Sequence, residues 1–336
     1  MKTKIIAEIG INHDGSIEKA MKLIDIAKKC NAHYAKFQLY KTDNLVTKKS
    51  PLAKYQMKNI KIKSQYDLLK KYEFDFDKMS FLKKYCDKKK INFLCSPFDD
   101  ESADFLVNKL NQKLIKVPSG EIDNFPMLKI LIKKNIKLII STGMSELNEI
   151  LKTYNFLKKN NYNVNKNLTF LHCVSSYPTK IIDMNLNFIN TLRNKFNVEV
   201  GLSDHTKDIS IAKFVVALNC SFIEKHITLS NKMTGPDHSS SLNPNNFKDF
   251  ANEIFKSEII MGKKLKTIKK NEAQNKKIAK KSIYAKRPIK KNEKFTKHNI
   301  ILKRPMINNA LSPDKYFLII GKKSNRDYSV DSPITK

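Results

Sequence analysis

The chain has no long apolar run and few cysteines. No apolar stretch among its 336 residues approaches the roughly 20 residues that a membrane-spanning helix needs, so we expect no membrane segment. The apolar run in the N-terminal sequence MKTKIIAEIG is too short for a signal peptide, and a charged residue follows it too closely. The five cysteines are odd in number and form no Cys-x-x-Cys pair, which is typical of a reducing compartment. We therefore expect a cytoplasmic protein without structural disulfides, in which Cys95 and Cys173 lie in strands as small apolar residues.

Acidic residues are half as frequent as basic ones. The chain has 32 Asp and Glu against 64 Lys and Arg, which gives a net charge of +32. A nucleic-acid-binding protein would concentrate this charge on one face, often with interleaved aromatics, whereas lysine here is spread along the whole chain. We interpret the charge as a compositional bias and expect no nucleic-acid partner, with a basic RNA-binding protein as the rival interpretation. The charge should still attract anionic substrates.

What the chain does contain is a repeated pattern, in which a short apolar run ends in polar residues. Eight such runs alternate with segments of helical length and apolar spacing. The predicted strands cover residues 4–10, 33–40, 91–97, 114–120, 137–144, 168–174, 199–206 and 222–229. Eight strands that alternate with eight helices are typical of a (β/α)8 barrel, in which active sites assemble at the C-terminal ends of the strands. The predicted fold is therefore α/β, a TIM barrel with a polar mouth, which points to an enzyme.

The composition changes after the predicted barrel. A barrel takes roughly 250 residues, and we place it at residues 1–262. Residues 263–280 are polar and basic, and we interpret them as a linker, partly helical. Short apolar runs with turn signals resume in residues 281–336, which predict a small β-rich domain. Two long connections, residues 41–74 and 230–246, lie on the catalytic side, where long loops usually cover substrate.

Two histidines end neighbouring strands of the predicted barrel. His205 follows the seventh strand next to Asp204, and His226 ends the eighth close to Glu224. Two imidazoles from adjacent strand ends can ligate one divalent ion and leave coordination positions open for catalysis. The plainer alternative is two hydrogen-bonded polar residues on the barrel rim. The pairing amid two carboxylates favours the metal site.

Two lysines lie in otherwise apolar strands. Lys36 and Lys116 would be costly inside a barrel unless they are paired or bound to an anion. With serines at other strand ends they could form a cradle for phosphate and carboxylate groups. These serines are Ser96, Ser119, Ser141 and Ser203. The alternative is that each lysine neutralises a glutamate such as Glu8 or Glu121. We favour the anion site and expect such neutral pairing as well.

The motifs EIGINHDGS, KFQ, SPF, KVPSGE, STGM, HCVSSYPT, GLSDHT, EKHITL and GPDHSSSLNP, in this order, together resemble the sialic acid synthase family. The resemblance covers almost the whole chain and implies a (β/α)8 barrel followed by an antifreeze-like (SAF) domain. It implies a metal-dependent condensation of phosphoenolpyruvate with an N-acetylated amino sugar aldehyde, with Mn²⁺ as the usual ion and Mg²⁺ or Co²⁺ as alternatives. It also implies a domain-swapped homodimer. The expected acceptor is N-acetylmannosamine, giving N-acetylneuraminate, and the alternative is 2,4-diacetamido-2,4,6-trideoxymannose, giving N,N'-diacetyllegionaminate.

The same resemblance assigns roles to individual residues. His205 and His226 match the metal ligands, and the catalytic groups are Glu8, Glu224 and Lys36. The residues that match phosphoenolpyruvate contacts are Lys36, Ser96, Lys116, Ser119, Ser141, Ser175 and Ser203. The residues that match contacts to the sugar are Gln38, Glu121, Tyr177, Asp237 and Arg304. Arg304 matches an arginine that the small domain extends to the sugar's N-acyl group across the dimer. The rival from another class is a carbohydrate sensor or scaffold that binds metal without catalysis.

Overall fold

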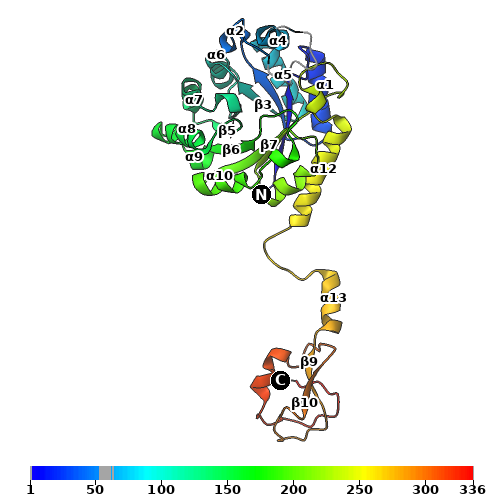
Figure 1. Cartoon of the computed structure of the whole chain (residues 1–336). Coiled ribbons are helices and arrows are strands. Elements are labelled where there is room, and N and C mark those ends of the chain that lie inside the picture. The colour runs from blue at the N-terminus through cyan, green and yellow to red at the C-terminus, as the bar shows by residue number, and fades with distance from the viewer. Residues whose placement is uncertain (1, 53–61, 63, 336) are drawn as a thin grey trace. The chain divides into compact units, whose positions relative to one another are not determined.

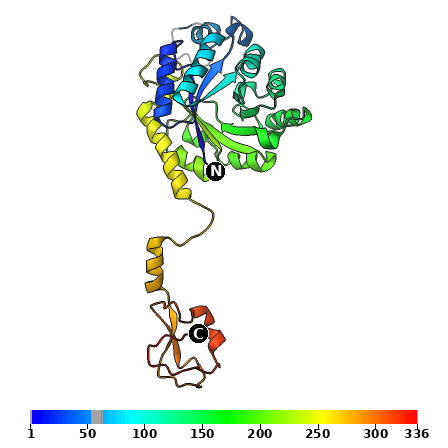
Figure 2. The same cartoon turned by 180° about the vertical axis from the view of Figure 1, so that it is seen from behind.

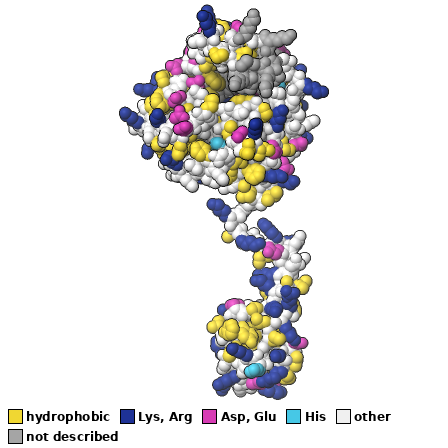
Figure 3. All heavy atoms as spheres, in the orientation of Figure 1, with side chains coloured by type: hydrophobic (Ala, Val, Ile, Leu, Met, Phe, Trp, Pro, Cys, Tyr) yellow, Lys and Arg dark blue, Asp and Glu magenta, His cyan; other side chains and the backbone are white. Residues whose placement is uncertain are grey.

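The chain forms two compact units, Met1–Gly262 and Lys263–Lys336. The structure is a computed structural model that describes residues 2–52, 62 and 64–335 (Figure 1). On the face shown in Figure 3, Lys and Arg side chains are spread over both units among side chains of other types. None of the helices in the described ranges combines the length and apolarity that a membrane span requires.

The first unit is a barrel of eight parallel strands. Their order in the sheet is β3-β2-β1-β8-β7-β6-β5-β4, and β3 and β4 at the two ends also lie against one another. The strands are β1 (Lys4–Gly10), β2 (Tyr34–Leu39), β3 (Asn92–Pro97), β4 (Leu114–Val117), β5 (Lys137–Ser141), β6 (Leu168–Cys173), β7 (Glu199–Asp204) and β8 (Phe222–His226). Each lies within a run predicted from the sequence, which confirms the barrel.

Helices surround these strands on the outside (Figures 1 and 2). They are α1 (Ile17–Lys29), α2 (Thr42–Leu45), α4 (Gln65–Tyr72), α5 (Phe76–Lys89), α6 (Asp100–Asp104), α7 (Phe125–Ile132), α8 (Leu147–Lys159), α9 (Val164–Asn167), α10 (Phe188–Phe196), α11 (Ile211–Ala217) and α12 (Pro244–Met261). Local signals explain where they begin. In α1, Ser16 accepts a hydrogen bond from the Lys19 backbone N–H and Glu18 occupies the first turn, as a helix N-terminus requires.

Alternation along the strands separates two apolar cores. In β1, Ile5, Ala7 and Ile9 belong to the large core under the helices, so Ile6 and Glu8 point the other way, into the barrel. The barrel interior holds a smaller cluster of Ile6, Leu94, Ile139, Leu171 and Phe222. This cluster closes the barrel beneath Glu8 and provides an apolar floor for the polar side chains at the strand ends.

The second unit has its own small core. Strand β9 (Ser282–Ala285) pairs antiparallel with β10 (Ile300–Lys303), and isolated bridges such as Ile289↔Tyr328 extend the β structure. The helices of this unit are α13 (Lys270–Ala279) and α14 (Tyr316–Ile319). The buried residues are Ile283, Ala285, Ile289, Phe295, Ile300, Ile319, Tyr328 and Ile334. The barrel followed by a small β-containing unit agrees with the predicted fold class.

The pairing of β7 with β8 generates a stability prediction, because these strands carry the two histidines. A Cβ on Gly201 would lie 2.4 Å from the Phe222 carbonyl oxygen and 2.6 Å from Leu171 Cδ2. Gly201→Ala should therefore lower the free energy of unfolding by about 1–3 kcal/mol, measured by denaturant titration. Gly120→Ala is the matched control, since its Cβ would meet nothing within 4 Å. Equal midpoints for the two variants would contradict this packing.

Candidate active site

A cavity of about 410 Å³ opens at the C-terminal ends of the strands. This is the end of a barrel at which catalytic residues are found. The cavity brings together most of the residues that sequence reasoning selected. These are Glu8, Lys36, Gln38, Lys116, Ser119, Ser141, Ser175, Tyr177, Ser203, His205, Glu224, His226 and Asp237. They come from seven of the strands or the loops that follow them, so only the closed barrel assembles them.

Two lysines and two glutamates form a buried cluster in this cavity, which we call the four-charge cluster. Lys36 Nζ lies 2.6 Å from Glu8 Oε2 and 3.4 Å from Glu224 Oε2, and Lys116 Nζ lies 3.9 Å from Glu224 Oε2. All four side chains are at most 4% exposed. Gln38 Nε2 also donates to Glu8 Oε1 at 3.0 Å. The neutral pairing expected for Glu8 is therefore present, together with a second carboxylate.

The cluster controls the ionisation of its members. Burial alone would raise the pKa of Glu224, but the positive charges of Lys116 and Lys36 outweigh burial and hold it at about 2. Burial lowers the pKa of Lys116, and Glu224 offsets this only in part. Lys116 Nζ otherwise donates to the Val117 carbonyl oxygen at 3.2 Å. Lys116 is therefore the less compensated cation, and an anion bound beside it would stabilise its charge.

The two histidine rings lie next to one another in the wall of the cavity. Their ring centroids are 5.4 Å apart and the ring planes are inclined at 69°. His205 donates its Nδ1–H to the Val174 carbonyl oxygen at 2.8 Å, so Nε2 is the nitrogen that carries the lone pair when the ring is neutral. Burial alone would lower the pKa of His205, but Cys173 and the hydrogen bond to Val174 outweigh burial and raise it. Within the described part of the chain, His226 Nδ1 is buried and has no hydrogen-bond partner. Burial and the neighbouring His205 lower the pKa of His226 well below its ordinary value, so its imidazole is neutral.

The two imidazoles are the groups here that could hold a metal ion. In residues 2–52, 62 and 64–335, no cluster of three or more His, Cys, Asp or Glu side chains has an arrangement that could ligate one. The nearest carboxylate is that of Asp237, whose Oδ2 lies 3.7 Å from His226 Nδ1. Burial raises the pKa of Asp237 to about 6.

Serine hydroxyls line the side of the cavity formed by β4, β5 and β6. The Gly143 backbone N–H donates to Ser119 Oγ at 3.0 Å, and Ser141 Oγ is buried without a partner among the described residues. A Cβ on Gly143 would lie 2.3 Å from Ser175 Oγ and 2.9 Å from Ser119 Oγ. Glycine at this position therefore keeps the space between the hydroxyls open, and hydroxyls around an open space can donate to an anion.

Two predicted site residues of the barrel unit do not line the cavity, and a third belongs to the second unit. Ser96 Oγ is fully buried in β3 and has no partner in the described ranges. Glu121 accepts a hydrogen bond from Asn124 at 2.8 Å. Among the described residues, the ion pairs of Lys36 and Lys116 are made with Glu8 and Glu224 and not with Glu121. Arg304 is an exposed residue of the second unit, immediately after β10.

Sequence reasoning missed several lining residues. Cys173, interpreted as a small apolar residue, lines the cavity with Sγ 4.0 Å from His205 Nδ1. Burial raises the pKa of this thiol, but His205 and Lys116 outweigh burial and lower it to about 7. The cavity also has apolar lining residues, namely Ile11, Leu68, Leu69, Phe98, Pro118 and Met144. The helical spacing of Leu68 and Tyr72 could have indicated α4 within the long connection 41–74.

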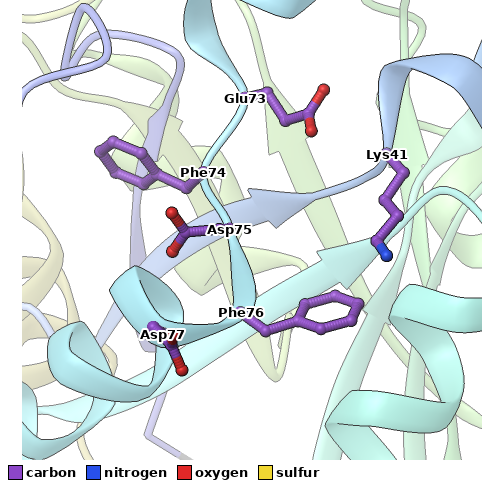
Figure 4. Close-up of a pocket in the computed structure, with 6 residues that line it drawn as sticks. All are labelled: Lys41, Glu73, Phe74, Asp75, Phe76 and Asp77. Carbon is purple, nitrogen blue, oxygen red and sulfur yellow. The ribbon is translucent and has the colours of Figure 1, made fainter.

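A second hollow of about 330 Å³ lies beside the segment between α4 and α5 (Figure 4). It is lined by Lys41, Glu73, Phe74, Asp75, Phe76 and Asp77, none of which lines the central cavity. Lys41 pairs with Glu101 at 2.5 Å and lies 4.9 Å from the Phe76 ring. Glu73 accepts from the Thr42 N–H at 3.1 Å. Lys41 and Glu73 are thus engaged by neighbours, and the central cavity, which gathers most of the predicted site residues, is the better candidate site.

Comparisons with known proteins identify the family of the chain. The model of the NeuB family matches residues 23–266, and that of the SAF domain matches residues 280–336. The chain is 41% identical to N,N'-diacetyllegionaminic acid synthase of Campylobacter jejuni, over 99% of each chain. It is 34% identical to human N-acetylneuraminate-9-phosphate synthase, over 84% of this chain and 77% of the relative.

A solved structure gives the same result for the fold. The crystal structure of N-acetylneuraminic acid synthetase from Leptospira borgpetersenii superposes with a TM-score of 0.71 at 29% identity, covering 82% of this chain and 90% of that one. The resemblance noted from the sequence motifs is confirmed by family models that cover both units. The chain belongs to the NeuB family and carries a C-terminal SAF domain.

Proposed function

We propose that this protein condenses phosphoenolpyruvate with an N-acetylated amino sugar aldehyde to give a nine-carbon 2-keto acid and phosphate. One observation carries this proposal: a single cavity holds the four-charge cluster beside two adjacent imidazoles. Lysines suit the phosphate and carboxylate of one substrate, and the imidazoles suit the carbonyl end of the other. The relatives support it, because their names describe synthases of legionaminic acid and of N-acetylneuraminate 9-phosphate.

The donor set fits a divalent cation. In its neutral form His205 has its lone pair on Nε2, because Nδ1–H is used by the Val174 carbonyl oxygen, and such a carbonyl contact is the usual support of a metal-bound imidazole. His226 Nδ1 is buried and has no hydrogen-bond partner among the residues that the structure describes, which makes it the second candidate donor. A bound cation, for which the family resemblance favours Mn²⁺, would polarise the aldehyde carbonyl of the acceptor.

The protein's own groups would bind phosphoenolpyruvate and hold its leaving phosphate. Lys116 is buried and incompletely compensated, so an anion beside it gains a charge-assisted hydrogen bond. Lys36 lies within the same cluster, and Ser119, Ser141 and Ser175 supply hydroxyls on the adjoining wall. We therefore place the phosphate and carboxylate groups on the side of the cavity formed by β4, β5 and β6.

Bond formation at carbon three of phosphoenolpyruvate leaves positive charge at its carbon two. Carbon three attacks the aldehyde carbon, and the aldehyde oxygen takes up a proton. Glu224, which stays ionised because its pKa is about 2, can stabilise the developing charge, as can Glu8. Water then adds to carbon two and becomes the new ketone oxygen, while the C–O bond to phosphate breaks. Of the two protons of the water, one passes through a cluster carboxylate and balances the proton taken up by the aldehyde oxygen, and the other leaves on the phosphate.

The acceptor is better supported as 2,4-diacetamido-2,4,6-trideoxymannose than as N-acetylmannosamine, the acceptor expected first from the sequence. The relative that matches 99% of both chains is named for diacetyllegionaminic acid. The cavity also has an apolar wall, in which Ile11 and Leu68 belong to one apolar cluster and Leu69 follows on α4. A methyl group at C6 suits such a wall, whereas a hydroxyl there would lose hydrogen bonds to water.

The family resemblance leads us to propose a cytoplasmic homodimer in which Arg304 contacts the acceptor bound by the partner. A mass near twice the 38.9 kDa of one chain in light scattering would agree with the dimer.

Two rival interpretations have their own tests. Salt-dependent gel shifts with RNA would support the RNA-binding interpretation, and absence of phosphate release with every acceptor would favour the non-catalytic sensor.

Removal of one imidazole should abolish both metal binding and turnover. His205→Ala deletes the nitrogen donor and leaves the barrel core intact, so we expect no Mn²⁺ binding in calorimetry and no phosphate release above background. His298→Ala, which changes an exposed histidine of the second unit, is the control. Full activity of His205→Ala after metal removal would refute the assignment of His205.

Removal of the less compensated lysine should weaken phosphoenolpyruvate binding. Lys116→Met keeps the volume of the side chain and removes its charge, so we expect the KM for phosphoenolpyruvate to rise about 10²-fold in a phosphate-release assay. Lys113→Met changes an exposed lysine three residues earlier and should behave as the wild type. An unchanged KM in Lys116→Met would remove Lys116 from the anion site.

The apolar wall should decide the choice of acceptor. We expect kcat/KM for the diacetamido trideoxy sugar to exceed that for N-acetylmannosamine by about 10- to 200-fold, with phosphoenolpyruvate and Mn²⁺ present. Leu69→Asn should lower this ratio, because a polar side chain can bond the extra hydroxyl. Leu265→Asn, at an exposed leucine, should leave the ratio unchanged. A wild-type preference for N-acetylmannosamine would exclude the proposed acceptor.

A further inference from the structure

We propose that Asp14 and His238 form a positioning pair that holds the Asp237 carboxylate in place for the acceptor sugar. This inference rests on the proposed function. The side chains that line the central cavity in the described ranges include Asp237 but neither Asp14 nor His238. The pair would therefore act through its neighbour, without contact to substrate.

His238 is fixed on both sides of its ring. Its side chain is 1% exposed, Nδ1 lies 2.6 Å from Thr228 Oγ1, and Nε2 donates to Asp14 Oδ1 at 3.0 Å. A Cβ on Gly235 would lie 2.6 Å from His238 Cδ2, so the loop backbone packs directly on the ring. The ring has no room to turn, and the residue next to it in the chain, Asp237, is held with it.

Asp14 is a well-anchored partner for this ring. Lys19 Nζ lies 2.7 Å from its second carboxylate oxygen, Oδ2. Burial alone would raise the pKa of Asp14, but the hydrogen bonds from His238 and Lys19 outweigh burial and lower it. The adjacent His13 stacks on Phe74 with ring centroids 3.9 Å apart. The loop after β1 is thus a fixed support against which the loop after β8 is placed.

The Asp237 carboxylate depends on this support for its position. The backbone carbonyl of Asp237 accepts hydrogen bonds from the Ser241 N–H at 3.0 Å and Ser241 Oγ at 2.7 Å, which fixes the peptide that follows. Asp237 Oδ2 then lies 3.7 Å from His226 Nδ1 at the edge of the cavity. Backbone bonds on one side and the His238 ring on the other determine where the carboxylate points.

The barrel itself does not need the pair to close. Strands β1 and β8 are joined by a continuous parallel ladder from Lys4↔Phe222 to Glu8↔His226. Asn12 Nδ2 also donates to the Ile227 carbonyl oxygen at 2.9 Å and to Ser241 Oγ at 2.8 Å. Loss of the Asp14 carboxylate should therefore shift the loop around Asp237 and leave the fold in place.

The experiment measures the KM of each substrate in Asp14→Asn and His238→Gln, with metal-loaded full-length protein. We expect the KM for the acceptor sugar to rise about tenfold, the KM for phosphoenolpyruvate to stay unchanged, and the thermal midpoint to shift little. Asp25→Asn is the matched control, because Asp25, on the outer helix α1, makes a comparable 2.7 Å ion pair with Lys89 at the end of α5. Equal changes in both KM values would overturn the positioning role.

A double-mutant cycle separates positioning from general damage. In an Asp237→Ala background, Asp14→Asn should add no further rise in acceptor KM, because the group that it positions is gone. The same fold-change in both backgrounds would overturn the proposal. If Asp14→Asn fails to fold, His238→Gln or Thr228→Val replaces it, and the acceptor KM is measured for that variant alone and in the Asp237→Ala background. A wild type that is inactive with both acceptors overturns the proposed function, whereas an active wild type with a wild-type-like Asp14→Asn overturns only the pair.

Discussion

Two carboxylates and two ammonium groups are buried together at the mouth of the barrel, and the active site depends on their mutual compensation. Glu8, Lys36, Lys116 and Glu224 are each at most 4% exposed, where an unpaired charge would cost several kcal/mol. Lys36 contacts both carboxylates, whereas Lys116 approaches Glu224 at 3.9 Å. The cluster is therefore stable by itself and still has a cation whose charge an incoming anion can complete.

The rest of the barrel provides the setting for this cluster. The apolar cluster inside the barrel, which contains Ile6 and Leu171, lies beneath the four charges. Its apolar side chains keep the local dielectric constant low, so each charge interaction is stronger than in water. The strands place the imidazoles of His205 and His226 beside the cluster. The loops after β1 and β8, joined by Asp14 and His238, hold the outer edge. The strands thus carry the charges, and the loops joined by Asp14 and His238 carry Asp237 at the edge of the cavity.

The sequence identified most of this site because the information was local. Strand alternation and strand ends predicted that Lys36, His205 and His226 share one mouth, and the cavity contains them. Sequence reasoning named both Glu8 and Glu121 as partners for the lysines and could not choose between them. Lys36 pairs with Glu8, whereas Glu121 bonds Asn124, and the thiol of Cys173 faces the cavity. The apolar wall from α4 was not anticipated, since its helix lies in a connection expected to be a loop.

The sequence by itself determined the barrel, the approximate bounds of its strands and the family to which the chain belongs. Each of these follows from short-range periodicity and from motifs read in order along the chain. Only the tertiary structure decided which charges compensate one another, which apolar residues line the cavity, and that Asp14 meets His238. Those contacts join residues up to 224 positions apart, and such distances are set by closure of the barrel, which no local pattern encodes.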